Sequence, residues 1–363
     1  RDEGVIGRRL SPPVLQISLE RHVSWGIQNG GISLLRYTFH RILQLIPVLV
    51  GVVVIVFTIN YFSEVSPANV ICGENATPEV IAAKEAELGL DQPYLVQIGS
   101  YFYRLVFQGD MGVSYTKSVP VSQLISERIA VSAIIGLMGA VVAILIGIPL
   151  GVLGALKQNS IWDYLSTTVS IICSAIPGFW LALLLMLMFS VELRWTPVTG
   201  VASWQGYINP IICSAFPGIA LLARMTRASI LENVNKDFVK TARAKGLRER
   251  DVIWKHMIRN SLIPVVTVIG SMLGHCITNG VVSETIFNIS GVGSLMNSSI
   301  TGKDYITTQG CVLVCAFMIA VGNMLTDLFY AVIDPRIKAQ YTRGAVKKRR
   351  RQKPALAKGG QPV

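Results

Sequence analysis

Long stretches without a charged residue constrain this chain more than any other feature. Six of these stretches are strongly apolar, at 42–63, 129–156, 164–191, 208–223, 261–283 and 305–326. Most of them reach the roughly 18 to 20 apolar residues that a helix needs to cross about 30 Å of hydrocarbon. Only 15% of the residues are charged, whereas about 25% are charged in an ordinary soluble domain. The sequence therefore predicts a protein whose main solvent is lipid.

The expected fold class is an all-α integral membrane protein with six transmembrane helices. A membrane β-barrel is excluded because its strands show alternating polarity over about ten residues, not continuous apolar runs. The fourth run is short, so we expect its helix to continue past Arg224 and Arg227 with their side chains reaching toward water. The expected helices cover about 41–63, 122–156, 163–191, 208–230, 261–285 and 305–333.

The distribution of Lys and Arg predicts which connections face the cytoplasm. The loop at 64–120 has three basic and seven acidic residues, so we expect it to be external. The stretch at 224–259 has ten basic and four acidic residues, which indicates a cytoplasmic segment. Six crossings then place both termini in the cytoplasm. In the external loop, residues 77–88 are typical of an amphipathic helix, with Thr77 as its cap and Val80, Ile81 and Leu88 on its apolar side.

The two ends of the chain are expected to lie outside the transmembrane domain, which spans 35–338. Residues 1–34 lack the compact apolar core of a cleaved signal peptide, and we expect a disordered or non-native extension there. Residues 339–363 form a basic tail containing "KKRRRQK". Contact with membrane lipid, or no specific partner, explains this tail and the net charge of +12 better than nucleic acid does.

The sequence contains no pattern typical of a catalytic site, such as a Walker glycine loop, zinc-type histidine spacing or a nucleophile elbow. Five of the six cysteines lie in apolar runs and are interpreted as packing residues; Cys72 lies in a polar loop. His275 lies in the fifth run, where a solvated or helix-bonded side chain is favoured over a metal ligand or a proton relay.

The charged segment, residues 237–260, interrupts this apolar chain. Its pattern predicts two short amphipathic helices separated by Gly246, which permits a tight turn. Val252, Ile253, His256 and Met257 fall on one face of the second helix. Pattern alone leaves three alternatives open: a solvated loop, a helix at the membrane surface, or a docking site for a partner protein.

The charged segment resembles the cytoplasmic "EAA…G" loop of ABC importer permeases, in the version found in the dipeptide, oligopeptide and nickel branch. Other motifs extend this resemblance over about 34–338. They include "LLRYTFHRILQLIPVLVGVVVIVF" at 34–57, "LGLDQPYLVQ" at 88–97, "GDMGVSY" at 109–115, "IGIPLGVLGALK" at 146–157, "IPGFW" at 176–180, "LLARMTRASILEN" at 221–233, "SETIFNISGVGSLM" at 283–296 and "DPRIK" at 334–338. All are similar to the first permease subunit of that branch.

The resemblance implies a type I importer fold and a set of partners. These are a second, similar permease, two cytoplasmic ABC ATPases and an extracytoplasmic solute-binding protein. The chain itself would bind no cofactor or metal, because ATP and Mg would be used by the ATPases. The resemblance also implies an ATPase-coupling site made of Lys240, Thr241, Ala242, Arg243, Ala244, Lys245, Gly246 and Leu247. Lys240 and Thr241 stand where the general motif has Glu and Ala.

The function implied by the resemblance is that of a non-enzymatic permease subunit importing di- or oligopeptides across a bacterial or archaeal inner membrane. A nickel or metal-chelate importer remains an alternative, because the same branch contains both and a fold does not fix a ligand. The substrate-binding residues are not identifiable from the sequence. An ion-coupled secondary transporter is disfavoured because few ionisable residues lie within the apolar runs.

Overall fold

The computed structural model describes residues 38–39, 41–63, 66–73 and 75–333, and over this part of the chain it consists of helices and connecting turns. Five single helices are long and apolar enough to cross a membrane. They are Arg41–Tyr61, Val121–Leu156, Trp204–Asn233, Glu249–Gly274 and Tyr305–Leu328. A sixth candidate is a bent pair, Ile161–Ala175 with Gly178–Glu192. The expected all-α membrane fold is therefore confirmed.

The chain divides into two units. One consists of Pro47–Thr326, and the other of the two ends, Arg1–Ile46 and Asp327–Val363. Within the second unit, Arg41 Nη1 lies 3.0 Å from Asp327 Oδ2. The expectations for 1–34 and 339–363 lie outside the described residues.

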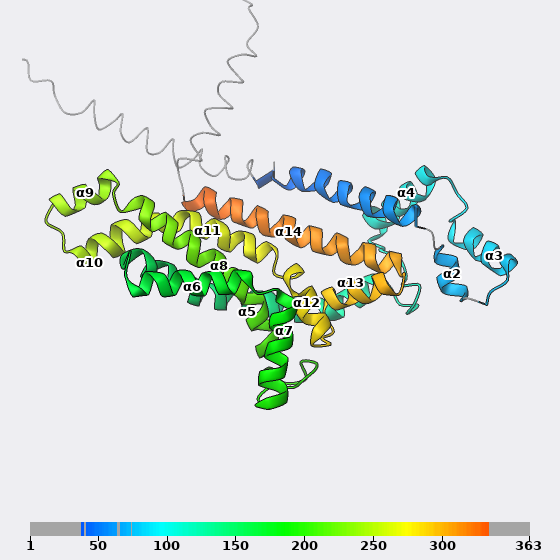
Figure 1. The fold of residues 1–363 in the computed structure, drawn as a ribbon. Helices are drawn as coiled ribbons and strands as arrows, with labels where there is room; N and C mark the ends of the chain where they lie inside the picture. The colour runs from blue at the N-terminus through cyan, green and yellow to red at the C-terminus, as the bar shows by residue number, and fades with distance from the viewer. Residues whose placement is uncertain (1–37, 40, 64–65, 74, 334–363) are drawn as a thin grey trace, which may run out of the picture. The chain divides into compact units, whose positions relative to one another are not determined.

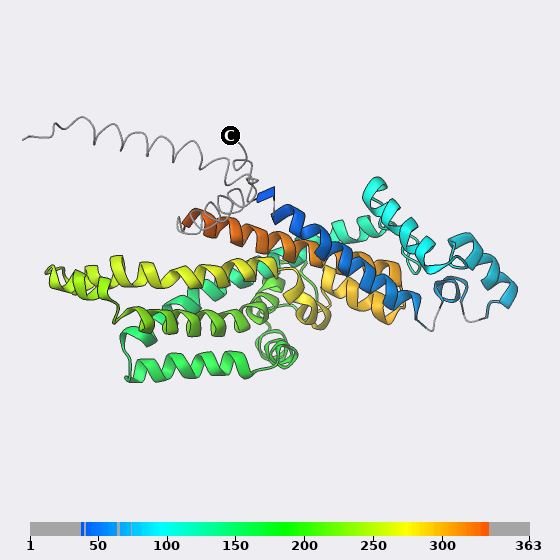
Figure 2. The ribbon, with the colours of Figure 1, turned by 90° about the horizontal axis from the view of Figure 1, so that it is seen from above.

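The centre of this unit is a bundle of α5 (Val121–Leu156), α8 (Ile208–Asn233) and α11 (Arg259–Gly274), which run side by side in Figures 1 and 2. Small residues on α5 let α8 approach closely. A Cβ at Gly147 or Gly151 would collide with the backbone oxygen of Ile219 or Ala223 on α8. Inside lipid there is no hydrophobic driving force between helices, so close packing of this kind stabilises their association instead.

The prediction of a single helix at 163–191 is wrong, because the helix is interrupted at Ile176 and Pro177. α6 (Ile161–Ala175) ends there, and α7 (Gly178–Leu185) leaves at 99° and continues as a π-helical segment, Met186–Glu192. Ile176 is extended, which is the conformation that a following proline favours. The new direction packs Leu181, Ala182 and Leu185 against Ile135 of α5.

The helix expected at 261–285 also has different bounds. It begins at Glu249, runs through α10 (Glu249–Asp251), the π-helical segment Val252–Ile258 and α11, and ends at Gly274. His275 follows, and its Nδ1 lies 2.9 Å from the carbonyl oxygen of Ser271. This places His275 as a helix-bonded side chain. A 3₁₀ turn, Thr278–Gly280, then leads into α12 (Val281–Ile286) and α13 (Val292–Thr301).

The buried carboxyl group of Glu284 holds α12 against α13. Glu284 is fully buried, and its Oε2 accepts a hydrogen bond of 3.1 Å from the backbone N–H of Ser294, in the first turn of α13. A Cβ at Gly291 would collide with the Glu284 carboxyl group. Glycine at this position therefore makes room for the buried Glu284 side chain.

Residues 66–108 form a group of helices that lies at the opposite end of the bundle from α9 (Asp237–Ala244) in both views (Figures 1 and 2). They are α2 (Pro67–Cys72), α3 (Pro78–Leu88), α4 (Tyr94–Tyr103) and the π-helical continuation Arg104–Gln108. The helix expected after Thr77 is present. However, the Thr77 side chain makes no capping hydrogen bond, and Val80 is 52% exposed, so the predicted apolar side is not buried.

Asp304 links residues 114–116, which follow these helices in the sequence, to α14 (Tyr305–Ile333). Its carboxylate accepts hydrogen bonds from the Ser114 hydroxyl, from Thr116 Oγ1 at 3.1 Å and from the Tyr115 backbone N–H at 3.2 Å. It also accepts one from Thr307 Oγ1 at 2.9 Å, in the first turn of α14. Burial alone would raise the pKa of Asp304, but these hydrogen bonds together hold that pKa below its usual value. Asp304 therefore acts as an anion.

We expect the contact between residues 114–116 and α14 to weaken in acid. The pKa of Asp304 is lower in the folded protein than in the unfolded chain. Its contribution to the free energy of unfolding is therefore complete above the unfolded-state pKa and is lost as the pH falls through the folded-state pKa. Asp304→Asn should remove about 2 kcal/mol at neutral pH, as expected for hydrogen bonds to a charged group. Thermal unfolding of both proteins measured across the acidic range checks this: the difference should shrink on acidification, and a constant difference would contradict the charge-based account.

Candidate functional site

The charged segment is built around α9, which sits in a sharp reversal between two long helices. α8 ends at Asn233, and α9 begins at Asp237 and ends at Ala244. Gly246 then adopts φ +74°, a left-handed conformation that glycine tolerates and that L side chains rarely adopt. The chain reverses there and enters α10 at Glu249. The expected glycine turn is therefore present, but the second helix is the beginning of a long membrane-crossing helix and not a separate short one.

One face of α9 is buried in an apolar cluster. Val239 (0% exposed) and Ala242 (5% exposed) point into it, and Val252, Met257 and Ile258 meet them from the facing helix. Ala155 of α5 and Ile230 of α8 complete the buried set. The predicted inward positions of Val252 and Met257 are confirmed, whereas Ile253 and His256 are half-buried. α9 is thus anchored directly to the ends of the bundle helices.

The opposite face of α9 is exposed. Of the eight residues expected to form the coupling site, only Ala242 is buried; the exposed ones are Lys240, Thr241, Arg243, Ala244, Lys245, Gly246 and Leu247. Phe238 and Leu247 add apolar surface, at 37% and 41% exposed. The exposed face of α9, with its basic and apolar residues, is a surface that a partner protein can contact. Because the opposite face is anchored in the bundle, a partner that moves α9 also moves the bundle helices.

An ion pair closes the turn around Gly246. Arg243 at the end of α9 donates from Nη2 and Nε to the two carboxylate oxygens of Glu249, at 2.7 and 3.2 Å. Both side chains are exposed, so water weakens this pair, and such pairs contribute at most about 1 kcal/mol. Its two-bond geometry nevertheless fixes the direction of α9 relative to α10.

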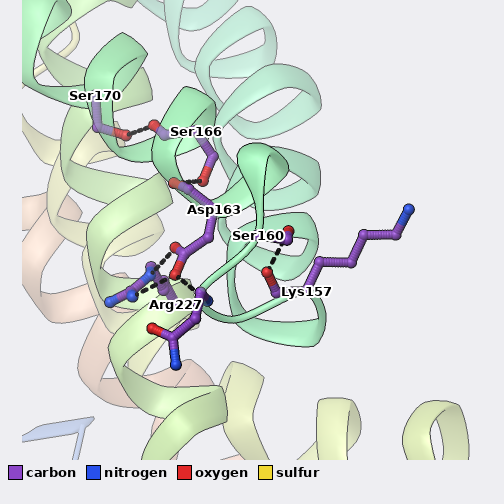
Figure 3. Close-up of polar contacts among 7 residues, drawn as sticks. Lys157, Ser160, Asp163, Ser166, Ser170 and Arg227 are labelled. Carbon is purple, nitrogen blue, oxygen red and sulfur yellow. Dashed lines mark hydrogen bonds and ion pairs between the residues drawn. The ribbon is translucent and has the colours of Figure 1, made fainter.

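A second and better-shielded ion pair joins α6 to α8 (Figure 3). Arg227 of α8 donates from Nε and Nη2 to the two oxygens of Asp163 on α6, at 2.7 and 3.0 Å. The side chain of Asp163 is only 7% exposed, and that of Arg227 is 34% exposed. The backbone N–H of Asn159 also donates to Asp163, at 3.0 Å. Arg227 stands one helical turn before Ile230, which belongs to the cluster under α9.

The polar contacts continue along α6 from this pair. The Ser166 hydroxyl donates to the Asp163 carbonyl oxygen at 3.0 Å, and the Ser170 hydroxyl donates to that of Ser166 at 2.8 Å (Figure 3). Arg224 Nη1 donates to the Ser170 carbonyl oxygen at 3.4 Å. The Arg227 side chain is partly exposed, as expected for the α8 arginines, but its charge is paired with Asp163, which the sequence did not predict. Its partner is 64 residues away in the sequence, and no local pattern indicates that pairing.

The sequence comparisons now decide the family. The profile of the family described as binding-protein-dependent transport system inner membrane component matches residues 147–339. The profile of the N-terminal part of that membrane component matches residues 34–136. The chain belongs to this family. It is accordingly a multi-pass membrane permease of an ABC importer that works with ATPase and permease partners, and ATP hydrolysis lies in separate subunits.

Relatives with similar sequences match over nearly their whole length. The dipeptide transport system permease protein DppB of Alkalihalophilus pseudofirmus is 37% identical over 333 residues, covering 84% of this chain and 100% of the relative. The glutathione transport system permease protein GsiC of Salmonella paratyphi A is 37% identical over 305 residues, covering 84% of this chain and 99% of the relative. The sequence similarity to permeases thus extends over the whole unit that contains the bundle and the charged segment.

A solved structure supports the fold independently. An inward-facing structure of the MetNI methionine ABC transporter matches with a TM-score of 0.51 at 14% identity. The match covers 59% of this chain and 97% of the transporter chain. At this identity the likeness shows the fold alone, and it is the type I importer permease fold.

Proposed function

We propose that this chain is the permease subunit that forms the membrane path for di- or oligopeptides in an ATP-driven importer. The peptide assignment rests on the 37% identity to two permeases, over nearly their whole length and 84% of this chain. One is named for dipeptide transport and the other for glutathione transport, and glutathione is itself a short peptide. A second, similar permease would complete the path. A solute-binding protein would deliver the peptide on the side of the acidic loop at 64–120, and both termini would lie in the cytoplasm.

The charged segment is proposed to be the point at which an ATPase moves this subunit. The exposed face of α9, from Lys240 to Leu247, would seat in a groove of an ATPase that uses ATP and Mg. Closure of the two ATPases then displaces α9 as a rigid piece. Val239 and Ala242 transmit this displacement to α8 and α11 through the buried cluster, and the Asp163–Arg227 pair carries α6 with α8. Alternating access requires such differential contacts between its two states.

Reconstitution tests this function. The importer, assembled in liposomes with its permease, ATPase and binding-protein partners, should take up labelled dialanine only when ATP is supplied. Dialanine should also stimulate ATP hydrolysis, whereas a nickel chelate should do neither. Stimulation by the nickel chelate alone would favour the metal-chelate alternative, and dialanine uptake without ATP would favour an ion-coupled carrier.

A further inference from the structure

A cavity of about 660 Å³ lies at the end of the molecule opposite the charged segment, among the helices of residues 66–108. Its walls come from the end of the helix Arg41–Tyr61, from α3, from α4 with its π-helical continuation, and from the first turns of α14. This volume falls within the range of roughly 300–1,000 Å³ that is typical of small-molecule sites. Neither the family nor the coupling proposal assigns it a role.

One side of the cavity offers hydrogen-bond donors and a positive charge. α4 and its continuation contribute Tyr101 and Arg104, and Tyr115 lines the same space. All three groups line the same cavity, and the charge of Arg104 lowers the pKa of each phenol, although burial has the larger and opposite effect. Burial raises the pKa of each tyrosine to about 12, so both keep their protons at neutral pH and act as donors. Arg104 makes no ion pair with any carboxylate among the described residues. This set is suited to a carboxylate.

Negative charge enters the cavity from a different helix. α3 contributes Glu85 and Glu87 to the lining. Glu85 Oε1 accepts a hydrogen bond of 2.6 Å from Ser66 Oγ, and Glu87 lies 2.8 Å from Lys84 Nζ. The Glu87 side chain is 66% exposed, so the cavity reaches solvent on this side. Two carboxylates with one neighbouring lysine leave an excess of negative charge, which suits an ammonium group.

Two buried donors in the lining lack partners. Tyr101 is 2% exposed and Gln309 is 4% exposed, yet neither the Tyr101 hydroxyl nor Gln309 Nε2 has a hydrogen-bond partner in the described part of the chain. Leaving a buried polar group unpaired costs about 1–3 kcal/mol, and such groups in native proteins call for an explanation. Because both residues line the cavity, an occupant with acceptor oxygens would provide the missing partners after small side-chain rotations.

We propose that this cavity is a receiving site for a short zwitterionic peptide. Its C-terminal carboxylate would lie at Arg104 and Tyr101, and its N-terminal ammonium group at Glu85 and Glu87. Separation of the two charges onto different helices favours a molecule charged at both ends over a simple anion or cation. The rings of Phe57 and Tyr61 in the lining offer apolar surface to the peptide side chains. This inference rests on the proposed peptide function and adds a site outside the membrane path.

Binding of dialanine to the assembled importer in nanodiscs, without its binding protein, tests the site. The unmodified importer should bind dialanine, and N-acetyl-dialanine amide, which lacks both charges, should not compete. Arg104→Ala should weaken binding about tenfold or more, as expected for loss of a charge-assisted hydrogen bond. Tyr101→Phe should weaken binding without lowering the unfolding temperature, because the hydroxyl it removes has no protein partner. Lys117→Ala and the exposed Tyr103→Phe, which lie outside the lining, are matched controls.

The outcomes separate this inference from the proposed function. If the complete importer takes up dialanine with ATP but its binding without the binding protein is absent, or is equal in Arg104→Ala and Lys117→Ala, the receiving site is refuted and the peptide function stands. Equal affinity for the neutral analogue also refutes it. If the complete importer neither imports nor responds to any short peptide, the proposed function itself fails.

Discussion

Replacing Gly246 by valine is expected to reduce peptide-stimulated ATP hydrolysis by about tenfold or more while the permease stays folded, because its φ of +74° costs a non-glycine residue about 1–3 kcal/mol. A Cβ at Gly246 meets nothing within 4 Å, so the cost comes from the backbone and not from a collision. The turn would relax to a negative φ and redirect α9 relative to α10. That change breaks the Arg243–Glu249 pair and turns the exposed face of α9 away from its partner.

Two measurements check this prediction. The first is the amount of ATPase that co-purifies with the permease, and the second is the increase in hydrolysis caused by loaded binding protein. Gly246→Asn is the matched control, since asparagine tolerates the left-handed conformation better than other side chains, and it should retain most of both. Unchanged co-purification together with unchanged stimulation in Gly246→Val would show that this turn does not direct an ATPase contact.

The sequence predicted the membrane helices well because lipid imposes a simple demand. Every backbone polar group must be satisfied within the helix, and every outward side chain must be apolar, so a run such as 129–156 is visible without any knowledge of its neighbours. The break at Pro177 had a visible local signal, the pair Pro177–Gly178. Hydropathy alone passed over it, because the two arms of the bent pair, taken together, are long and apolar enough to pass as one membrane span.

The polar contacts that lock the bundle were not predictable in the same way. Asp163 and Arg227 lie in different helices, and Asp304 meets Ser114 across 190 residues. Each of these acids stands at the edge of an apolar run, where a solvated side chain is the ordinary interpretation. Only the packing of one helix against another reveals that the acid is buried and paired. The coupling residues were accessible from the sequence because their pattern is local: a short amphipathic helix followed by glycine.

Neutralising Asp163 alone, as Asp163→Asn, is expected to lower the free energy of unfolding by about 3 kcal/mol, because it leaves Arg227 without its charged partner in a shielded position. This is the lower end of the range for breaking a buried pair, since Arg227 is one-third exposed. Thermal unfolding can be followed with a thiol-reactive dye. Five buried free thiols react with it only when the bundle opens; they belong to Cys173, Cys213, Cys276, Cys311 and Cys315.

A double variant distinguishes the pair from either residue alone. Asp163→Leu with Arg227→Met removes both charges together, and it should be more stable than the sum of the two single variants predicts, by about 1–3 kcal/mol of coupling. Strictly additive losses would show that the two side chains stabilise the bundle independently. Uptake gives the functional test: with the bundle folded but α6 no longer tied to α8, the double variant should hydrolyse ATP while importing less peptide per ATP. Full coupling in that variant would mean that α6 follows α8 through apolar packing alone.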